Sequence, residues 1–217
     1  MATKKKKITE DDIIEMYMDY VLENETFPKS IYKFSKENKF KEEEFYLFYG
    51  SLEALQKGIW EKFYSNSIKV MNNNDEYSSF SNKDKMLTFF YTFFELLTLN
   101  RSYVLFALKA EKNPLKNLAQ LKGVRTHLKN FAKELIDQGN GNKISKLTKQ
   151  NPQLYSEWAW LQFLFILKFW INDDSPGFEK TDMAIEKSVN TIFDVFDNTP
   201  LENIVDFGKF LYKETFA

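Results

Sequence analysis

Residues 34–55 read FSKENKFKEEEFYLFYGSLEAL, and the pattern of the whole chain can be followed outward from them. Apolar residues recur in this stretch at the spacing of an α-helix, interrupted by polar residues around Asn38 and then by Gly50-Ser51. The stretch therefore predicts the end of one short helix and a second short helix over residues 41–48. A long helix is expected to start at Ser51 and to end near Met71.

Helical patterns continue on both sides of this stretch. Thr9 and Asp12 form a capping-box pattern for a first helix that ends near Asn24. Pro28 suits the first turn of the second helix. The polar stretch 72–82 predicts a boundary between domains. Later helices are expected after a cap at Ser81, over residues 86–99, 103–109, 114–135 and 152–171, after a cap at Thr181, and after Pro200.

The composition predicts an all-α protein. Only 7 Gly and 5 Pro occur in 217 residues, so turns are few and the elements between them are long. The 22 Phe, 11 Tyr and 4 Trp residues supply a bulky apolar core. Strands would show alternating apolar and polar residues, and no such run extends beyond a few residues.

Several classes of function are excluded by what the sequence lacks. The chain has no Cys and a single His, His127, which rules out disulfides, thiolate catalysis and cysteine-ligated zinc. No nucleophile accompanies a base, so we expect no enzyme, no cofactor and no metal. The basic tail at residues 1–7 lacks the apolar segment of a secretory signal, and we expect a cytoplasmic protein. This tail is either a solvated segment or an arm that grasps phosphate.

Residues 34–55 resemble the helix-turn-helix of TetR-family regulators. That family ends its recognition helix with an aromatic-Tyr pair and a further aromatic residue, followed by Pro or Gly, Ser, and a helix with Glu and Leu. The matching residues here are Ser35, Phe40, Phe45-Tyr46, Tyr49, Gly50-Ser51, Glu53 and Leu55. The resemblance implies a TetR-like fold with a three-helix helix-turn-helix unit at residues 1–50. It also implies a ligand-binding and dimerisation domain at residues 51–217, and a homodimeric regulator.

The front end departs from the family pattern in ways that weaken DNA binding. Lys39 stands where the family usually has Gly, and Leu52 stands where it usually has Lys. The helix face that would meet DNA reads Lys41-Glu42-Glu43-Glu44. Between Ile8 and Lys62 there are 7 Lys and no Arg against 13 Asp and Glu, a net charge of −6. Because DNA affinity depends mainly on neutralising phosphates, we expect DNA binding to be weak.

The residues that this resemblance places nearest DNA are mostly lysines on the second helix and the turn after it. They would contact phosphates or, equally, form an ordinary solvated face. The candidate DNA-binding residues are Lys29, Lys33, Lys36, Lys39, Lys41 and Tyr46.

A second resemblance suggests an alternative function. Phe169-Trp170, the turn 173–178 and Thr181-Asp182 are similar to a segment of the lipid-binding accessory protein of coenzyme Q biosynthesis. That protein is a TetR-fold relative that binds lipid and a partner enzyme instead of DNA. The alternative is therefore a lipid-binding accessory protein that has lost DNA binding and acts through a protein partner.

The family resemblance also implies a pocket for a hydrophobic small molecule or lipid among the central helices. His127 would contribute a polar contact to the ligand. The same aromatic residues would also serve as ordinary core. The candidate ligand-binding residues are Phe90, Phe94, Tyr103, Phe106, His127, Phe131 and Trp158.

The helix at 152–171 is apolar on nearly every face, which raises the question of a transmembrane span. Glu157, Gln162 and Lys168 argue against one. A soluble helix of this kind is packed on several sides, and we expect it to form a four-helix bundle with a second copy of the chain. The candidate dimer-interface residues are Phe165, Phe169, Ile185, Val189, Ile192 and Phe196.

Overall fold

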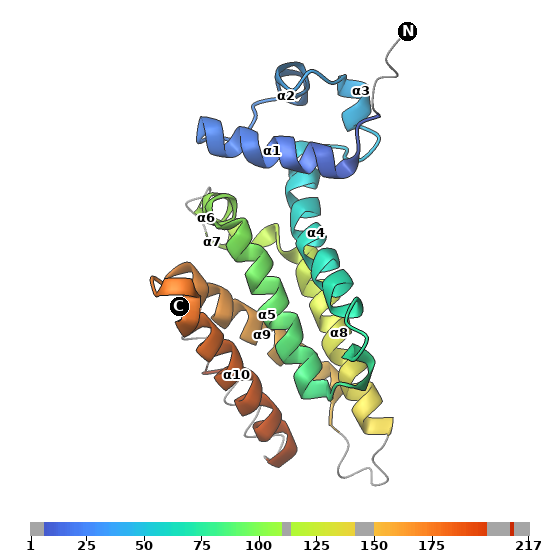
Figure 1. The fold of residues 1–217 in the computed structure, drawn as a ribbon, viewed down its shortest axis with the longest axis vertical. Helices are drawn as coiled ribbons and strands as arrows, with labels where there is room; N and C mark the ends of the chain where they lie inside the picture. The colour runs from blue at the N-terminus through green and yellow to red at the C-terminus, as the bar shows by residue number, and fades with distance from the viewer. Residues whose placement is uncertain (1–6, 110–113, 142–149, 199–208, 211–217) are drawn as a thin grey trace. The chain divides into compact units, whose positions relative to one another are not determined.

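The computed structural model describes residues 7–109, 114–141, 150–198 and 209–210 (Figure 1). These residues contain helices and no strand, which confirms the all-α prediction. The helices are α1 (Glu10–Asn24), α2 (Ile31–Glu37), α3 (Glu42–Phe45), α4 (Leu52–Asn72), η1 (Tyr77–Ser79), α5 (Asn82–Leu99), α6 (Arg101–Lys109), α7 (Pro114–Ala119), α8 (Lys122–Gly141), α9 (Pro152–Ile171), η3 (Pro176–Phe178) and α10 (Glu179–Asn198).

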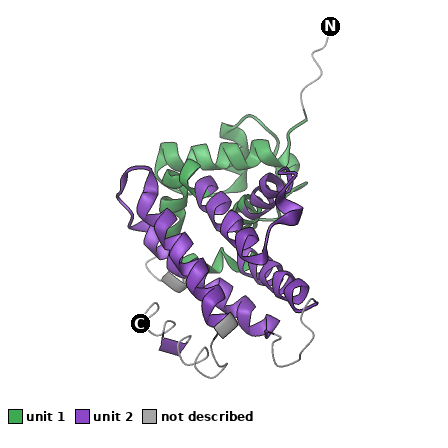
Figure 2. Cartoon of the chain, turned by 60° about the horizontal axis from the view of Figure 1, so that its bottom comes forward, with its two compact units in different colours: residues 1–63, 97–123 green, residues 64–96, 124–217 purple. Residues whose placement is uncertain are grey.

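The chain forms two compact units, coloured separately in Figure 2. Unit 1 comprises Met1–Phe63 and Leu97–Gly123, and unit 2 comprises Tyr64–Leu96 and Val124–Ala217. The chain passes between them three times, and each passage lies inside a helix, namely α4, α5 and α8. The domain boundary at residue 50 stays a prediction, and the polar stretch 72–82 lies within unit 2.

Unit 1 is organised around an aromatic centre. The ring of Phe34 in α2 meets the rings of Tyr17 in α1 and Phe45 in α3 edge-on, at 5.8 and 6.4 Å. Tyr17 also packs against Tyr103 of α6, with ring centroids 6.4 Å apart. All four rings are buried, so α6 is part of the same core as the three N-terminal helices.

Unit 2 has an aromatic core between α5 and α9. Phe163 of α9 packs against Phe93 and Phe94 of α5 at 5.5 and 5.9 Å, and Trp170 packs against Phe94 at 6.3 Å. On the far side of α9, the Gln162 amide donates to Ser188 Oγ of α10 at 2.9 Å. This pairing satisfies a buried amide, since unpaired polar groups are costly in a core.

The starts of the helices test the capping predictions. Thr9 caps α1, with a reciprocal pair of hydrogen bonds to Asp12, and Ser81 caps α5 through the Asp84 N–H; both confirm the predictions. The second helix starts later than predicted, because Ser30 caps it. Pro28 therefore lies ahead of α2 and not in its first turn.

The turn between α2 and α3 has the geometry of a Schellman motif. The Phe40 N–H donates to the Ser35 carbonyl at 3.1 Å, and the Lys39 N–H donates to the Lys36 carbonyl at 3.3 Å. Lys39 has a φ of 59°, in the left-handed region that favours glycine. The turn thus keeps the conformation that a glycine would adopt, with lysine in its place.

Three further expectations were wrong in their bounds. The third helix is a single turn, shorter than the predicted 41–48, and the predicted helix over 114–135 is two helices that break at Gln120-Leu121. Thr181 lies inside α10 instead of capping it. The helix expected after Pro200 falls outside the described residues, apart from Lys209 and Phe210.

Candidate functional site

A groove of about 450 Å³ opens on unit 2 between α4, η1, α5 and α8, and we call it the outer groove. Tyr64, Ile68 and Asn72 line it from α4; they are spaced four residues apart and therefore share one helix face. The α8 wall runs from His127 to Gln138. The volume lies within the range of small-molecule sites in proteins.

An aromatic stack forms part of the groove lining. The rings of Tyr64 and His127 lie nearly parallel, with centroids 5.0 Å apart and an interplanar angle of 18°. The Tyr64 hydroxyl donates to the His127 carbonyl at 3.4 Å. Burial, with a smaller contribution from the charge of Glu134, raises the pKa of Tyr64 to about 12. Tyr64 is therefore a neutral hydrogen-bond donor at physiological pH.

The remaining two elements also line the groove, η1 with Tyr77 and α5 with Lys85. The Lys85 ammonium lies over the Tyr77 ring, 5.8 Å from its centroid. Asn82, one turn before Lys85, donates to the Leu135 carbonyl of α8 at 2.6 Å and so fixes the start of α5 against α8. The apolar side chains of Ile68, Phe131 and Leu135 also face the groove. It thus combines three apolar side chains with the ammonium of Lys85, the carboxylate of Glu134 and neutral donors.

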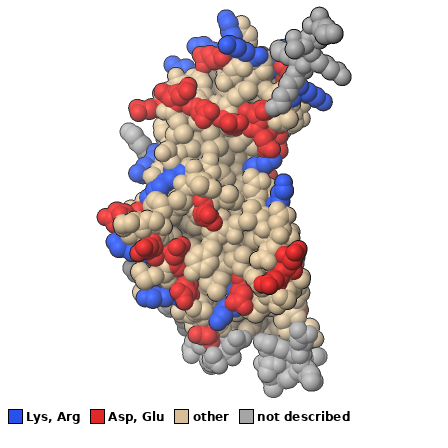
Figure 3. Space-filling view, in the orientation of Figure 1, with Lys and Arg blue, Asp and Glu red and all other residues tan. Residues whose placement is uncertain are grey.

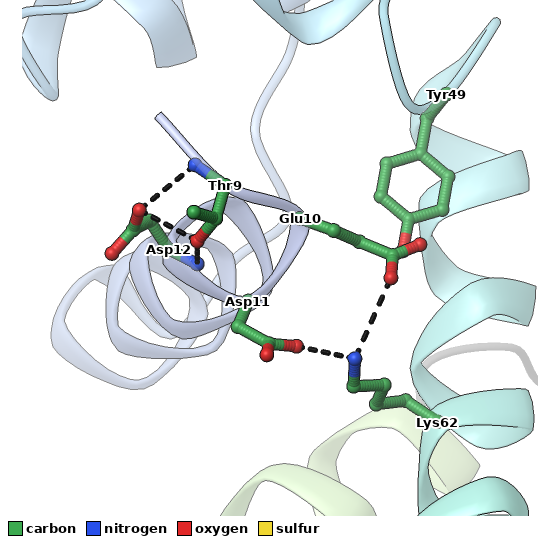
Figure 4. Close-up of polar contacts among 6 residues, drawn as sticks. All are labelled: Thr9, Glu10, Asp11, Asp12, Tyr49 and Lys62. Carbon is green, nitrogen blue, oxygen red and sulfur yellow. Dashed lines mark hydrogen bonds and ion pairs between the residues drawn. The ribbon is translucent and has the colours of Figure 1, made fainter. Parts of the chain in front are cut away.

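Within unit 1, a polar clamp joins the start of α1 to α4 (Figure 4). Lys62 of α4 pairs with Asp11 at 2.5 Å and with Glu10 at 3.5 Å. The Tyr49 hydroxyl donates to Glu10 at 3.0 Å. Burial and this hydrogen bond raise the pKa of Tyr49, which keeps its hydroxyl protonated as a donor.

Gly58 of α4 allows Tyr49 to reach this clamp. A Cβ atom at Gly58 would lie 2.5 Å from the Tyr49 ring carbon Cε1, closer than van der Waals contact permits. The absence of a side chain therefore lets the ring of Tyr49 lie directly against the α4 backbone.

The glutamates of α3 are engaged in local contacts. Glu44 accepts from the Lys41 N–H at 2.8 Å, at the start of the helix, and Glu43 pairs with the Lys41 ammonium at 3.0 Å. Glu42 accepts from the Tyr46 hydroxyl at 3.1 Å. The hydrogen bond to Glu43 raises the pKa of Lys41. Two of the candidate DNA contacts, Lys41 and Tyr46, are thus partly occupied by neighbouring carboxylates.

The other candidate DNA contacts are exposed. They are Lys29, Lys33, Lys36 and Lys39. Figure 3 shows lysines over the α2 end of unit 1 and a band of Asp and Glu over α1. Unit 1 therefore presents its cations and its excess of carboxylates on different helices.

Comparison with known proteins places the chain in a family. A family model described as the tetracyclin repressor-like C-terminal domain matches residues 85–211, which is more than half of the chain. The chain belongs to the TetR family. Members of the TetR family are regulators and are generally dimeric and ligand-binding. No curated protein and no solved structure matches the chain.

The structure separates the residues that the TetR resemblance implied as ligand contacts. His127 and Phe131 line the outer groove. Phe90, Phe94 and Trp158 are buried in unit 2, where Phe90 packs against Phe89, Phe94 against Phe93, and Trp158 against Phe196. The other two, Tyr103 and Phe106, belong to unit 1 and contact Tyr17 and Phe27.

Tyr103 is nevertheless unusual among these residues. Its hydroxyl is buried and has no hydrogen-bond partner among the described residues. Burial and the nearby Tyr17 raise its pKa well above the ordinary value. The Tyr17 hydroxyl itself accepts from the Gln56 amide at 2.8 Å. A buried donor without a partner carries a desolvation cost.

The residues expected at a TetR dimer interface differ in burial between α9 and α10. Ile185, Val189 and Phe196 of α10 are buried within the single chain. Ile192 and Phe169 are half-buried, and the Phe165 side chain is 44% exposed. The outward surface of α9 thus carries Phe165 and Phe169, whereas the α10 stripe packs mainly inward.

Sequence reasoning missed Tyr64, Tyr77 and Lys85. The spacing of Tyr64, Ile68 and Asn72 on α4 was the available signal for one wall of the groove.

Among the described residues, no helix is long and apolar enough to cross a membrane, and no cluster of metal-ligating side chains occurs. In α9, Glu157 pairs with Arg125 at 3.3 Å and with Lys129, both on α8.

Proposed function

We propose that this chain is a TetR-type homodimeric regulator that binds a hydrophobic small molecule or lipid in its C-terminal domain, residues 51–217. Residues 1–50 then form the part that faces DNA, with weak DNA affinity. The regulator acts in the cytoplasm without catalytic activity. The observation that carries this proposal is that α4 lines the outer groove with Tyr64 and holds α1 through Lys62.

A ligand in the groove would act on the helix that also anchors the N-terminal helices. Tyr64 and Lys62 are only two residues apart on α4, so a rotation of the helix at Tyr64 also displaces the Lys62 ammonium. A ligand shifts such an equilibrium only by its difference in affinity for the two arrangements. A bulky ligand that separates Tyr64 from His127 would supply that difference.

Weak DNA binding follows from the charges of the front end. A net charge of −6 between Ile8 and Lys62 opposes the phosphates, and Lys41 is already paired with Glu43. The exposed lysines of α2, together with the basic tail, supply what attraction remains.

The test combines ligand and DNA binding on one preparation. The full chain is incubated with a pool of random DNA duplexes in about 0.15 M salt, and bound duplexes are selected and sequenced. Organic extraction and mass spectrometry identify a stoichiometric hydrophobe. The proposal predicts a recovered hydrophobe and an enriched duplex of only modest affinity, which the hydrophobe releases. Absence of both a recovered hydrophobe and an enriched duplex would contradict it.

The alternative is an accessory protein that has lost DNA binding and acts through a protein partner. It is favoured by the exposed apolar side chains on the helix-turn-helix surface: Tyr32, Tyr46 and Leu47 are 59, 53 and 65% exposed. Recovery of a hydrophobe with no enriched duplex would favour this alternative over the regulator.

The homodimer has its own test. We propose that Phe165 and Phe169 of α9 contact the second copy, since they are large apolar side chains on the outward surface of a mostly buried helix. Sedimentation of the chain at micromolar concentration should show a dimer, and Phe165→Glu should convert it to a monomer. Leu99→Glu, at a side chain that is 74% exposed on α5, is the matched control and should remain dimeric.

A further inference from the structure

We propose that the outer groove binds a monocarboxylate with an apolar body. The carboxylate would pair with Lys85, and the apolar body would lie along Ile68, Phe131 and Leu135. This inference rests on the proposed ligand-binding function and adds to it the location of the site and the class of ligand. Four observations on unit 2 carry it.

The first observation is the environment of the Lys85 side chain. Lys85 lines the groove and is half-buried as a residue, and its ammonium lies 5.8 Å from the centroid of the Tyr77 ring. None of the ion pairs among the described residues involves Lys85. A carboxylate that pairs with a half-buried lysine is screened by water less than one that pairs with a fully exposed lysine.

The second observation is the charge balance of the lining. Among the described residues that line the groove, Lys85 is the one lysine or arginine and Glu134 is the one carboxylate. A dianion such as a phosphate monoester would leave a negative charge uncompensated beside Glu134. A single carboxylate matches the single ammonium, and Glu134 is exposed to solvent, so it competes little for it.

The third observation is the shape of the lining. Tyr64 and Asn72 are eight residues apart on α4, which corresponds to about 12 Å at the rise of an α-helix. Ile68 lies between them, with Phe131 and Leu135 on the α8 wall. An elongated apolar body would therefore contact these three apolar side chains, in a groove of about 450 Å³ whose other lining residues carry polar groups.

The fourth observation is the aromatic part of the lining. Tyr64, His127 and Tyr77 all line the groove, and aromatic side chains pack against either an aromatic ring or an alkyl chain. The shared chemistry is a carboxylate on an apolar body. A fatty acid and an aromatic acid are the two sources that experiment must distinguish.

The experiment measures binding of decanoate, 2-naphthoate and decanol to the full chain by isothermal titration calorimetry. Decanoate or 2-naphthoate should bind about tenfold more tightly than decanol, the advantage expected of a charge-assisted contact. Stronger binding of decanoate would identify a fatty acid and stronger binding of 2-naphthoate an aromatic acid, and either supports the proposal.

Two variants and one control locate the site. Lys85→Gln should remove the advantage of the carboxylates over decanol, and Phe131→Ala should weaken all probes that bind. Lys83→Gln, two residues earlier on α5 and outside the groove lining, should change neither. Circular dichroism confirms that each variant is folded.

The failures of the two proposals are distinguishable. If decanol binds as well as the carboxylates, or if Lys85→Gln behaves like Lys83→Gln, the inferred anion contact is wrong and the groove remains a site for neutral hydrophobes. If no probe binds, or if Phe131→Ala leaves binding unchanged, the groove is not the ligand site, and the monocarboxylate inference fails with it. A hydrophobe recovered by extraction would then keep the ligand-binding function while placing it elsewhere.

Discussion

Lys39 shows how one residue preserves a turn at an energetic cost. Its left-handed backbone closes α2 and positions Phe40, whose ring packs against Phe34 at 5.5 Å. A side chain in this conformation costs about 1 kcal/mol or more relative to glycine. Lys39→Gly should therefore raise the free energy of unfolding by about 0.5–1 kcal/mol, after the greater entropy of the unfolded glycine is subtracted.

Chemical denaturation measures this difference. Lys36→Gly is the matched control, because Lys36 lies in the last turn of α2 and glycine inside a helix destabilises by about 0.5–1 kcal/mol. Loss of stability in both variants would show that the left-handed turn carries no strain.

Asp173 holds the turn before α10 by accepting four hydrogen bonds. Its carboxylate accepts from the N–H and hydroxyl of Ser175 at 2.9 and 2.7 Å, and from those of Thr181 at 2.9 and 2.6 Å. Burial raises the pKa of Asp173, but these hydrogen bonds outweigh it and hold the pKa well below the ordinary value. The stabilisation is therefore present above the ordinary aspartate pKa of about 3.9 and is lost as the pH falls below it.

Asp173→Asn should lower the free energy of unfolding at pH 7 by about 1–2 kcal/mol, because an amide offers one acceptor oxygen in place of two. The difference from the original chain should shrink as the pH falls below about 3.9. Asp174→Asn is the control, since Asp174 is exposed and its one ion pair among the described residues is with exposed Lys180. A pH-independent difference between the Asp173 variant and the original chain would contradict this account.

At the scale of the element, the clamp on α1 depends on one lysine of α4. Lys62→Met removes the pairs with Asp11 and Glu10 and should lower the free energy of unfolding by about 1 kcal/mol at low salt. The loss should diminish at about 1 M salt, where charges are screened. Lys57→Met, at an exposed position on the same helix, should have almost no effect.

The pH dependence of this clamp has the opposite sign to that of Asp173. The hydrogen bond to Asp11 raises the pKa of Lys62 despite partial burial. Its contribution is therefore complete below the ordinary lysine pKa of about 10.4 and is lost only as the pH rises above it. Denaturation curves of Lys62→Met and the original chain should converge at strongly alkaline pH and remain apart at neutral pH.

The helices were predictable from sequence where a local signal specified them. The Thr9 capping box and the start of α9 at Pro152 are local signals, and both helices begin as predicted. The predicted cap at Thr181 failed because its hydroxyl donates to Asp173, eight residues earlier, instead of capping α10.

The candidate site was much less predictable than the helices. The outer groove combines residues from four elements, and most of its lining is polar, so no single apolar pattern marks it. The aromatic residues that stood out in sequence fill the cores instead, because buried aromatic rings pack against one another. The family resemblance of residues 34–55 indicated the fold correctly, but of the seven ligand contacts that it implied, the groove lining contains two, His127 and Phe131.

At the scale of the whole molecule, the helices shared by the two units predict cooperative unfolding. Because α4, α5 and α8 each contribute to both units, unfolding of one unit removes helical turns from the other. Thermal unfolding followed by circular dichroism and by tryptophan fluorescence should give one coincident transition. Lys39→Gly in unit 1 and Asp173→Asn in unit 2 should both shift it. Two separate transitions would contradict this expectation.

The three passages inside helices also constrain how such a protein can change by recombination. A genetic crossover after residue 63 would transfer most of unit 1 but leave residues 97–123 behind, including Tyr103, which packs against Tyr17. Each hybrid would then have to match a foreign α6 to its own α1. A hybrid that takes its N-terminal helices from a relative is therefore expected to need both segments of unit 1, residues 1–63 and 97–123, from that relative. Gene fusions that move one of these segments alone should yield insoluble products.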